Sequence, residues 1–170
     1  MPAGEIHYPS PPSSATEISS ADGANEDEAF VWSQIKAEAR RDAESEPALA
    51  SYLYSTILSH SSLERSLAFH LGNKLCSSTL LSTLLYDLFL NSFSSDPEIR
   101  AATVADLRAA RMRDPACVSF SHCLLNYKGF LACQVLLFNT TIDASLSSYS
   151  LAEISICNCS MINCYCYLKS

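Results

Sequence analysis

The stretch that decides how the chain is organised is Val104-Ala105-Asp106-Leu107-Arg108-Ala109-Ala110-Arg111-Met112-Arg113-Asp114-Pro115-Ala116. The residues up to Arg113 favour a helix, and Pro115 disfavours the α region for the residue before it. The sequence therefore predicts a helix that ends near Arg113. Asp114 would then lie at the helix C-terminus, where the macrodipole disfavours a carboxylate, and we expect Arg111 and Arg113 to offset that effect. Two interpretations stay open: Asp114-Pro115 forms a turn, or Asp114 is a ligand group.

Upstream of this stretch, apolar residues recur at helical spacing. In the first helix this pattern places Val31, Ile35 and Ala39 on one face. The predicted helices cover residues 29–46, 47–59, 63–75, 79–91 and 95–113, and a sixth runs from about Leu124 or Lys128 to Gln134. Five or six helices joined by short links predict an all-α helical bundle over residues 29–134. We expect the helix over 79–91 to be the most buried, with Leu84 and Leu88 in the core. Gly72 either allows a close contact between helices or simply lowers the helix propensity.

The two ends of the chain differ from this domain. Residues 1–28 contain acidic side chains, Ser and Pro but no Lys or Arg, and they account for most of the net charge of −7. We predict that residues 1–28 form a disordered acidic arm, because such a composition buries too little apolar surface to offset its ordering entropy. Residues 135–170 are rich in Ser, Cys, Ile and Asn without a clear period. We predict an irregular tail there. Our hypothesis for its origin is that it is translated intron sequence or the product of a wrong gene model.

Several short blocks, taken together, resemble the N-terminal helical domain of a plant-type serine O-acetyltransferase. They are Gly72-Asn73-Lys74-Leu75, Asp96-Pro97-Glu98-Ile99, Arg113-Asp114-Pro115-Ala116 and Tyr127-Lys128-Gly129-Phe130. The resemblance implies membership of a family that transfers acetyl from acetyl-CoA to L-serine in cysteine biosynthesis. It also implies that Asp114 is a substrate-binding residue, whose carboxylate binds the ammonium group of serine.

The hexapeptide repeats that carry the family's general base and acetyl-CoA groove find no counterpart after Gln134. No histidine of the chain matches the family base, so we assign no catalytic residue and expect no cofactor site. We expect a truncated form that is inactive alone. The alternative is a non-catalytic oligomerisation module that associates with full-length subunits, for which we expect an uncovered apolar side at Phe130 and Leu131. Serine and acetyl-CoA are the small-molecule partners that the resemblance implies.

Charge, hydropathy and cysteine content limit the other partners and the location that the sequence favours. The domain has no basic patch, which argues against a nucleic-acid partner, and its apolar helices are too short to span a membrane. Without a secretory or transit signal, a cytoplasmic location is expected. Cys76, Cys117, Cys123 and Cys133 are expected to be structural. Four tail cysteines form a pattern with some capacity for Zn²⁺, but the single-residue spacing within each pair is unusual, and we predict no metal site. They are Cys157, Cys159, Cys164 and Cys166.

Overall fold

The structure, a computed structural model, describes residues 19–145, and the all-α prediction is confirmed for them. The elements are α1 (Ser19–Ser45), α2 (Pro47–Leu53), the π-helical turn η1 (Tyr54–Leu58), α3 (Leu63–Leu75), α4 (Ser82–Ser95), α5 (Pro97–Arg113), α6 (Phe120–Asn126) and α7 (Lys128–Ser145). These described residues hold seven α-helices, one more than predicted, because the segment after Pro115 forms a short helix of its own.

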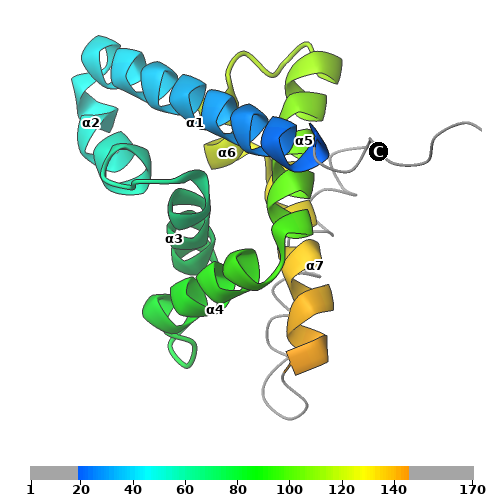
Figure 1. Cartoon of the computed structure of the whole chain (residues 1–170). Coiled ribbons are helices and arrows are strands. Elements are labelled where there is room, and N and C mark those ends of the chain that lie inside the picture. Colours follow the sequence, from blue (N-terminus) through cyan, green and yellow to red (C-terminus); the bar gives the residue numbers. More distant parts are fainter. Residues whose placement is uncertain (1–18, 146–170) are drawn as a thin grey trace, which may run out of the picture.

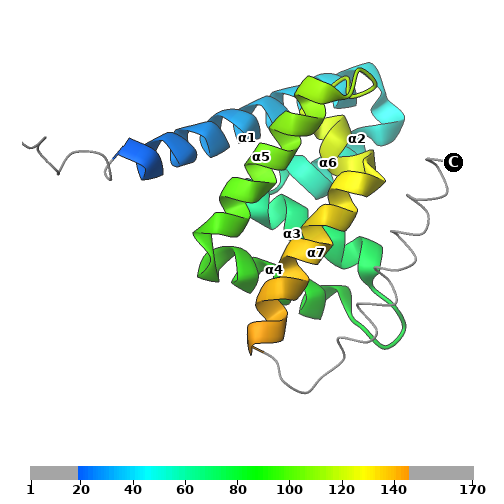
Figure 2. The same ribbon diagram turned by 90° about the vertical axis from the view of Figure 1, so that its right-hand side faces the viewer.

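The helices pack around one core to which every element contributes (Figure 1). The long α1 crosses one end of the molecule, with α2 at its far end and α6 beneath it. Helices α5 and α7 lie side by side and run away from α1 (Figure 2). Helix α3 packs against α4, and α4 reaches α7 at the opposite end. The turn that carries Asp114 therefore lies near α1, at the end of the α5–α7 pair.

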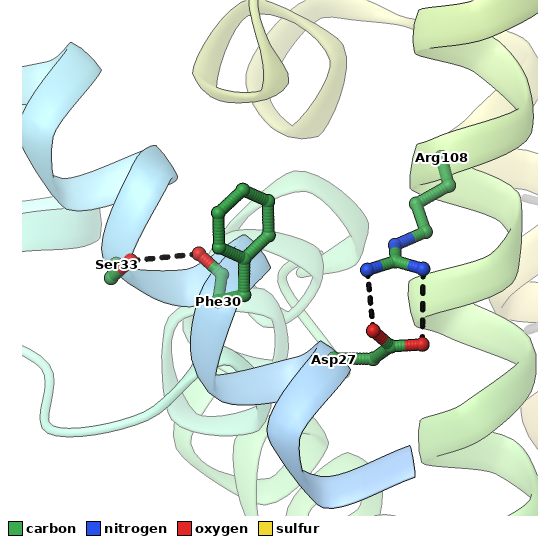
Figure 3. Close-up of polar contacts among 4 residues, drawn as sticks. All are labelled: Asp27, Phe30, Ser33 and Arg108. Carbon is green, nitrogen blue, oxygen red and sulfur yellow. Dashed lines mark hydrogen bonds and ion pairs between the residues drawn. The ribbon is translucent and has the colours of Figure 1, made fainter. Parts of the chain in front are cut away.

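Helix α1 starts earlier than predicted. Val31, Ile35 and Ala39 are buried, as their spacing predicted. The prediction of disorder through residue 28 was wrong for residues 19–28, which are helical, while residues 1–18 lie outside the described part. A tertiary contact that composition does not reveal anchors this start. The Asp27 carboxylate accepts two hydrogen bonds from the Arg108 guanidinium of α5, at 2.6 and 3.0 Å (Figure 3).

Helix α7 continues past Gln134, so the prediction of an irregular tail was wrong for residues 135–145; residues 146–170 lie outside the described part. Val135 and Phe138 extend the buried face of the helix beyond Leu131. The Phe138 ring packs on two rings of α4, with centroids 4.8 Å from Phe89 and 4.7 Å from Phe93. Because α7 folds back along α5, the apolar side expected to be uncovered is covered: Phe130 is 6 % exposed and Leu131 is 1 % exposed.

Helix α4 presents a different face to the core from the one predicted. Leu84 is half exposed and Leu88 only partly buried, whereas Leu85, Phe89 and Phe93 are fully buried. The helix is apolar on most sides, so its own sequence does not choose the buried face. The face is set by its neighbours, namely α3 on one side and Phe138 of α7 on the other.

The contact of α4 with α3 depends on Gly72, which confirms the close-contact interpretation of this residue. A Cβ atom at this position would lie 2.9 Å from the backbone oxygen of Ser82 and 3.3 Å from the backbone nitrogen of Tyr86. Backbone atoms cannot rotate away as a side chain would. Glycine is therefore required at this crossing for the two helices to approach so closely.

The two faces of α4 predict different costs of truncation. Leu85→Ala deletes a fully buried side chain and should lower the free energy of unfolding by about 2–5 kcal/mol. Leu84→Ala removes a half-exposed side chain on the same helix and should cost less than about 1 kcal/mol. Urea denaturation of both variants measures the difference. Equal costs would mean that α4 is rotated relative to the structure described here.

A second contact of α1 involves two carboxylates. Glu28 lies beside Glu64 of α3, whose Oε1 is 3.7 Å from the Arg100 guanidinium of α5. The second Glu64 oxygen is buried without a hydrogen-bond partner among the described residues. Partial burial, followed by the charge of Glu64 and a hydrogen bond to it, raises the pKa of Glu28 above its ordinary value of 4.5, and Arg100 opposes the effect.

This raised pKa makes a prediction with a definite sign. The contribution of Glu28 to stability is fully present below pH 4.5 and is lost as the pH rises through the raised pKa, because the charged form is disfavoured in the folded state. Glu28→Gln should therefore raise the melting temperature at neutral pH and flatten its decline above pH 4.5. The exposed Glu26→Gln serves as the control, and parallel pH profiles for wild type and Glu28→Gln would contradict the prediction.

Candidate functional site

The candidate site is built around Asp114, at the C-terminus of α5. The helix ends at Arg113 as predicted, and Asp114 has an extended backbone with φ −101° and ψ 109°. Pro115 explains this conformation, since its ring excludes the α region for the preceding residue. The Asp114 N–H still donates to the Ala110 carbonyl at 3.0 Å, so the residue stays attached to the helix while its side chain leaves the helical path.

The Asp114 side chain closes a tight turn, which confirms the turn interpretation and fixes the direction of the carboxylate. Its Oδ1 accepts a hydrogen bond from the Ala116 N–H at 2.8 Å, and its carbonyl accepts one from the Cys117 N–H at 3.0 Å. This arrangement is an Asx-turn. The carboxylate is half buried, and the turn uses one of its two oxygens. The carboxylate also takes part in a hydrogen bond with the Tyr127 side chain. Since a carboxylate has about four acceptor sites, lone pairs remain for a ligand.

Arg111 and Arg113 both lie in the last turn of α5, before Asp114. Neither Arg111 nor Arg113 forms an ion pair with Asp114 in the part of the chain that the structure describes. Arg111 instead donates to the Cys117 carbonyl at 2.8 Å and so braces the loop after Asp114. The carboxylate is instead hydrogen-bonded by the backbone N–H of Ala116 and by the side chain of Tyr127.

Two groups near this carboxylate, Tyr127 and Cys123, have raised pKa values. Desolvation raises the pKa of Tyr127 to about 12, and the negative charge of Asp114 adds to the effect. Desolvation, then Cys117, and then the charge of Asp114 raise the pKa of the buried Cys123 thiol, also to about 12. A thiol with a raised pKa is a poor nucleophile, so Cys123 acts as a packing residue at neutral pH. Cys117 and Cys123 are both free thiols with no more than 1 % exposure.

The four histidines have separate positions. The His70 side chain is buried, with Nε2 3.1 Å from the Leu125 carbonyl, and His60 Nε2 is 3.1 Å from the Ser55 carbonyl. His122 follows the Asp114 loop and packs edge-on against Tyr127, with centroids 5.5 Å apart. Its Nδ1 is buried without a hydrogen-bond partner among the described residues. His7 lies outside the described part of the chain.

Helix α1 positions the loop through contacts that the sequence analysis missed. Glu38 Oε2 accepts a hydrogen bond from the Ser121 N–H at 2.8 Å, and Asp42 Oδ2 lies 3.4 Å from the Ser121 hydroxyl. These carboxylates are four residues apart and share one face of α1. Their spacing is visible in the sequence, but their partner lies about eighty residues away. Only the fold brings the pair to the start of α6.

Gln134 forms a second set of contacts that the sequence did not predict, between α7 and α5. It is fully buried between α5 and α7, where its Oε1 is 2.6 Å from the Thr103 hydroxyl and its Nε2 donates to Asp106 at 3.0 Å. A buried amide is tolerated only when its donors and acceptors are paired. Here the pairing fixes the register of α7 against α5, the helix that ends at Asp114.

Among residues 19–145 no group of three or more His, Cys, Asp or Glu side chains could hold a metal ion. The tail cysteines Cys157, Cys159, Cys164 and Cys166 lie outside these residues. None of the described helices is long and apolar enough to cross a membrane.

Comparison with known proteins finds one family along most of this domain. A family model described as "Serine acetyltransferase, N-terminal" matches residues 31–135. Serine acetyltransferase 5 of Arabidopsis thaliana is 71 % identical over 146 residues, which cover 78 % of this chain and 47 % of the relative. Probable serine acetyltransferase 1 of rice (Oryza sativa subsp. japonica) is 69 % identical over 133 residues, which cover 78 % of this chain and 40 % of the relative. The chain thus spans less than half the length of these curated relatives.

A solved structure gives the same result for the fold. The soybean serine acetyltransferase complexed with serine is 73 % identical to this chain. The two align with a TM-score of 0.71 over 80 % of this chain and 54 % of the soybean chain. The matched part includes the greater share of the described helices.

The electrostatic contact of Asp114 with Tyr127 is open to a direct test. Asp114→Asn keeps the Ala116 hydrogen bond but removes the negative charge that disfavours the phenolate. The pKa of Tyr127 should therefore fall from about 12, yet stay above 10.0 because desolvation remains. Titration of ¹³C-labelled tyrosine by NMR measures the shift, with the exposed Asp87→Asn as control. An unchanged pKa in Asp114→Asn would show that the two side chains are not in contact.

Proposed function

Because the chain belongs to the serine acetyltransferase family, we propose that its helical domain serves the transfer of an acetyl group from acetyl-CoA to the hydroxyl of L-serine, a step of cysteine biosynthesis. The observation that carries the proposal is the match over residues 31–135, which includes the Asp114 turn. The soybean relative that was solved with serine supports serine as the substrate.

In this reaction Asp114 binds the ammonium group of serine. A carboxylate forms charge-assisted hydrogen bonds with an ammonium group, and these are stronger than neutral ones. The Asx-turn supports the role, because the Ala116 N–H holds one carboxylate oxygen and so presets the direction of the side chain. Little rotamer entropy then remains to be lost when the substrate binds.

The 170 residues on their own are proposed to be inactive. A general base needs an accessible nitrogen and a partner that orients it. Among the described histidines, His70 lines a pocket that does not include Asp114, and the Nδ1 of His122 is sealed from solvent. The curated relatives are more than twice as long as the segment matched here, so the groups that move the proton are expected in their other half.

A second candidate function is an oligomerisation module that associates with full-length subunits. Its support comes from α4 and the turn before it, where Leu81 is 64 % exposed and Leu84 is 50 % exposed. Half-buried Leu80 and Leu88 adjoin them. Apolar side chains gathered on one surface favour contact with another protein. Phe130 and Leu131, the residues first expected to provide this surface, are buried and do not take part.

The substrate role of Asp114 predicts a specific kinetic defect. We would fuse residues 1–134 to the C-terminal half of the soybean enzyme and measure the serine-dependent release of CoA from acetyl-CoA. Asp114→Asn preserves the turn but removes the charge, so kcat/KM for serine should fall about 10- to 100-fold, as expected for the loss of a hydrogen bond to a charged group. The KM for acetyl-CoA should stay within about twofold, since only the serine contact is removed.

Two comparisons complete this experiment. Asp87→Asn, an exposed carboxylate of α4, should leave both substrates unaffected. The unfused 170-residue chain should show no turnover, and serine-dependent release by that chain would contradict its proposed inactivity. An unchanged kcat/KM for serine in Asp114→Asn would remove Asp114 from the substrate site.

A further inference from the structure

A cavity of about 400 Å³ lies between α2, the π-helical turn η1 and α3. Its volume falls within the range of small-molecule sites. It is lined by Tyr52, Ser55, Thr56, Phe69, His70, Asn73 and Lys74. It does not include Asp114, and the function proposed above makes no use of it.

His70 gives the floor of this cavity a hydrogen-bond acceptor. The side chain is 4 % exposed, and its Nε2 is 3.1 Å from the Leu125 carbonyl of α6. A carbonyl only accepts, so Nε2 carries the hydrogen. Burial and the nearby charge of Lys74 lower the pKa of His70 to about 4, which keeps the ring neutral at physiological pH. Nδ1 is then the acceptor nitrogen of the ring.

The π-helical turn adds a second polar group. The Ser59 N–H donates to the Tyr54 carbonyl five residues before it, at 2.9 Å, which is the π-type bond. The carbonyl of the buried Thr56 is taken by the Ser66 hydroxyl at 2.7 Å. Thr56 is 3 % exposed and lines the cavity beside His70. Single π-turns inside helices are frequent at functional sites.

The rim supplies a cation and two aromatic rings. Lys74 is exposed and forms no ion pair with any described residue. It follows His70 by four positions on α3, so the two side chains share one face with Cβ atoms roughly 6 Å apart. Tyr52 is 44 % exposed on the α2 side. The Phe69 ring is held by His60, with ring centroids 5.0 Å apart.

We propose that this cavity binds a small organic anion with a flat apolar body and a hydroxyl donor, of the hydroxyaryl carboxylate class. The carboxylate pairs with the Lys74 ammonium, and the ring packs against Phe69 and Tyr52. The hydroxyl at the far end donates to His70 Nδ1, with Thr56 beside it. A para-substituted ring carries its carboxylate and its hydroxyl at opposite ends, as pairing with both Lys74 and His70 requires. A free amino acid fits less well, since no carboxylate lines the cavity to pair with its ammonium group.

The test is an NMR titration of the isotopically labelled 170-residue chain with 4-hydroxybenzoate as the probe. The amide signals of η1 and the second half of α3 should shift, together with the ¹⁵Nδ1 signal of His70. Lys74→Gln should weaken binding at least about tenfold, the effect of losing a hydrogen bond to a charged group. Lys36→Gln is the matched control, because Lys36 lies over the Trp32 ring of α1, 5.3 Å from its centroid, and should leave the affinity unchanged.

Two further probes separate the contacts. Benzoate lacks the hydroxyl donor and 4-hydroxybenzyl alcohol lacks the charge, so each should bind more weakly than 4-hydroxybenzoate, and benzoate should leave the His70 Nδ1 signal in place. The proposal is overturned if the probe causes no shifts up to its solubility limit. It is also overturned if the shifts lie outside η1 and α3, or if Lys74→Gln binds as tightly as the wild type.

Discussion

The ring of Pro115 imposes the constraint on which the candidate site depends. It excludes the α region for Asp114, so α5 must end and the chain must turn. The turn lets α6 reach α1 and lets α7 return along α5. The same turn occupies one oxygen of the Asp114 carboxylate with a backbone N–H. A single backbone restriction thus sets both the path of the chain and the direction of its candidate substrate ligand.

Buried polar contacts convert this path into a defined arrangement of helices. Gln134 joins α7 to α5 through Thr103 and Asp106, and Glu38 of α1 accepts from the first turn of α6. Apolar packing alone tolerates sliding between helices, whereas a paired amide in the core has one register. The loop of Asp114 is therefore held from two directions, although it is short and lies at the surface.

The sequence predicted the features that depend on local chemistry. Pro115 marked the end of α5, the i, i+4 spacing of Val31, Ile35 and Ala39 marked the buried face of α1, and Gly72 marked a helix crossing. The sequence-based prediction was wrong where a residue far away in the chain determines the local structure. Because α4 is apolar on most sides, its sequence does not predict which face packs against Phe138. The acidic start of α1 likewise does not predict that Asp27 binds Arg108. Likewise, the sequence indicated a turn at Asp114–Pro115. It did not indicate the hydrogen bonds from α1 and α7 that hold the neighbouring helices in place.

The close crossing at Gly72 couples the position of α4 to both α3 and α7. An added methyl group would press on the backbone of Ser82 and Tyr86, so the helix as a whole would have to move. In its second half, α4 contains Phe89 and Phe93, whose rings pack against the Phe138 ring of α7. A movement of α4 at this crossing would therefore also disturb its aromatic contact with α7. Because α7 runs along α5, the smallest residue of α3 is mechanically linked to the helix that ends at Asp114.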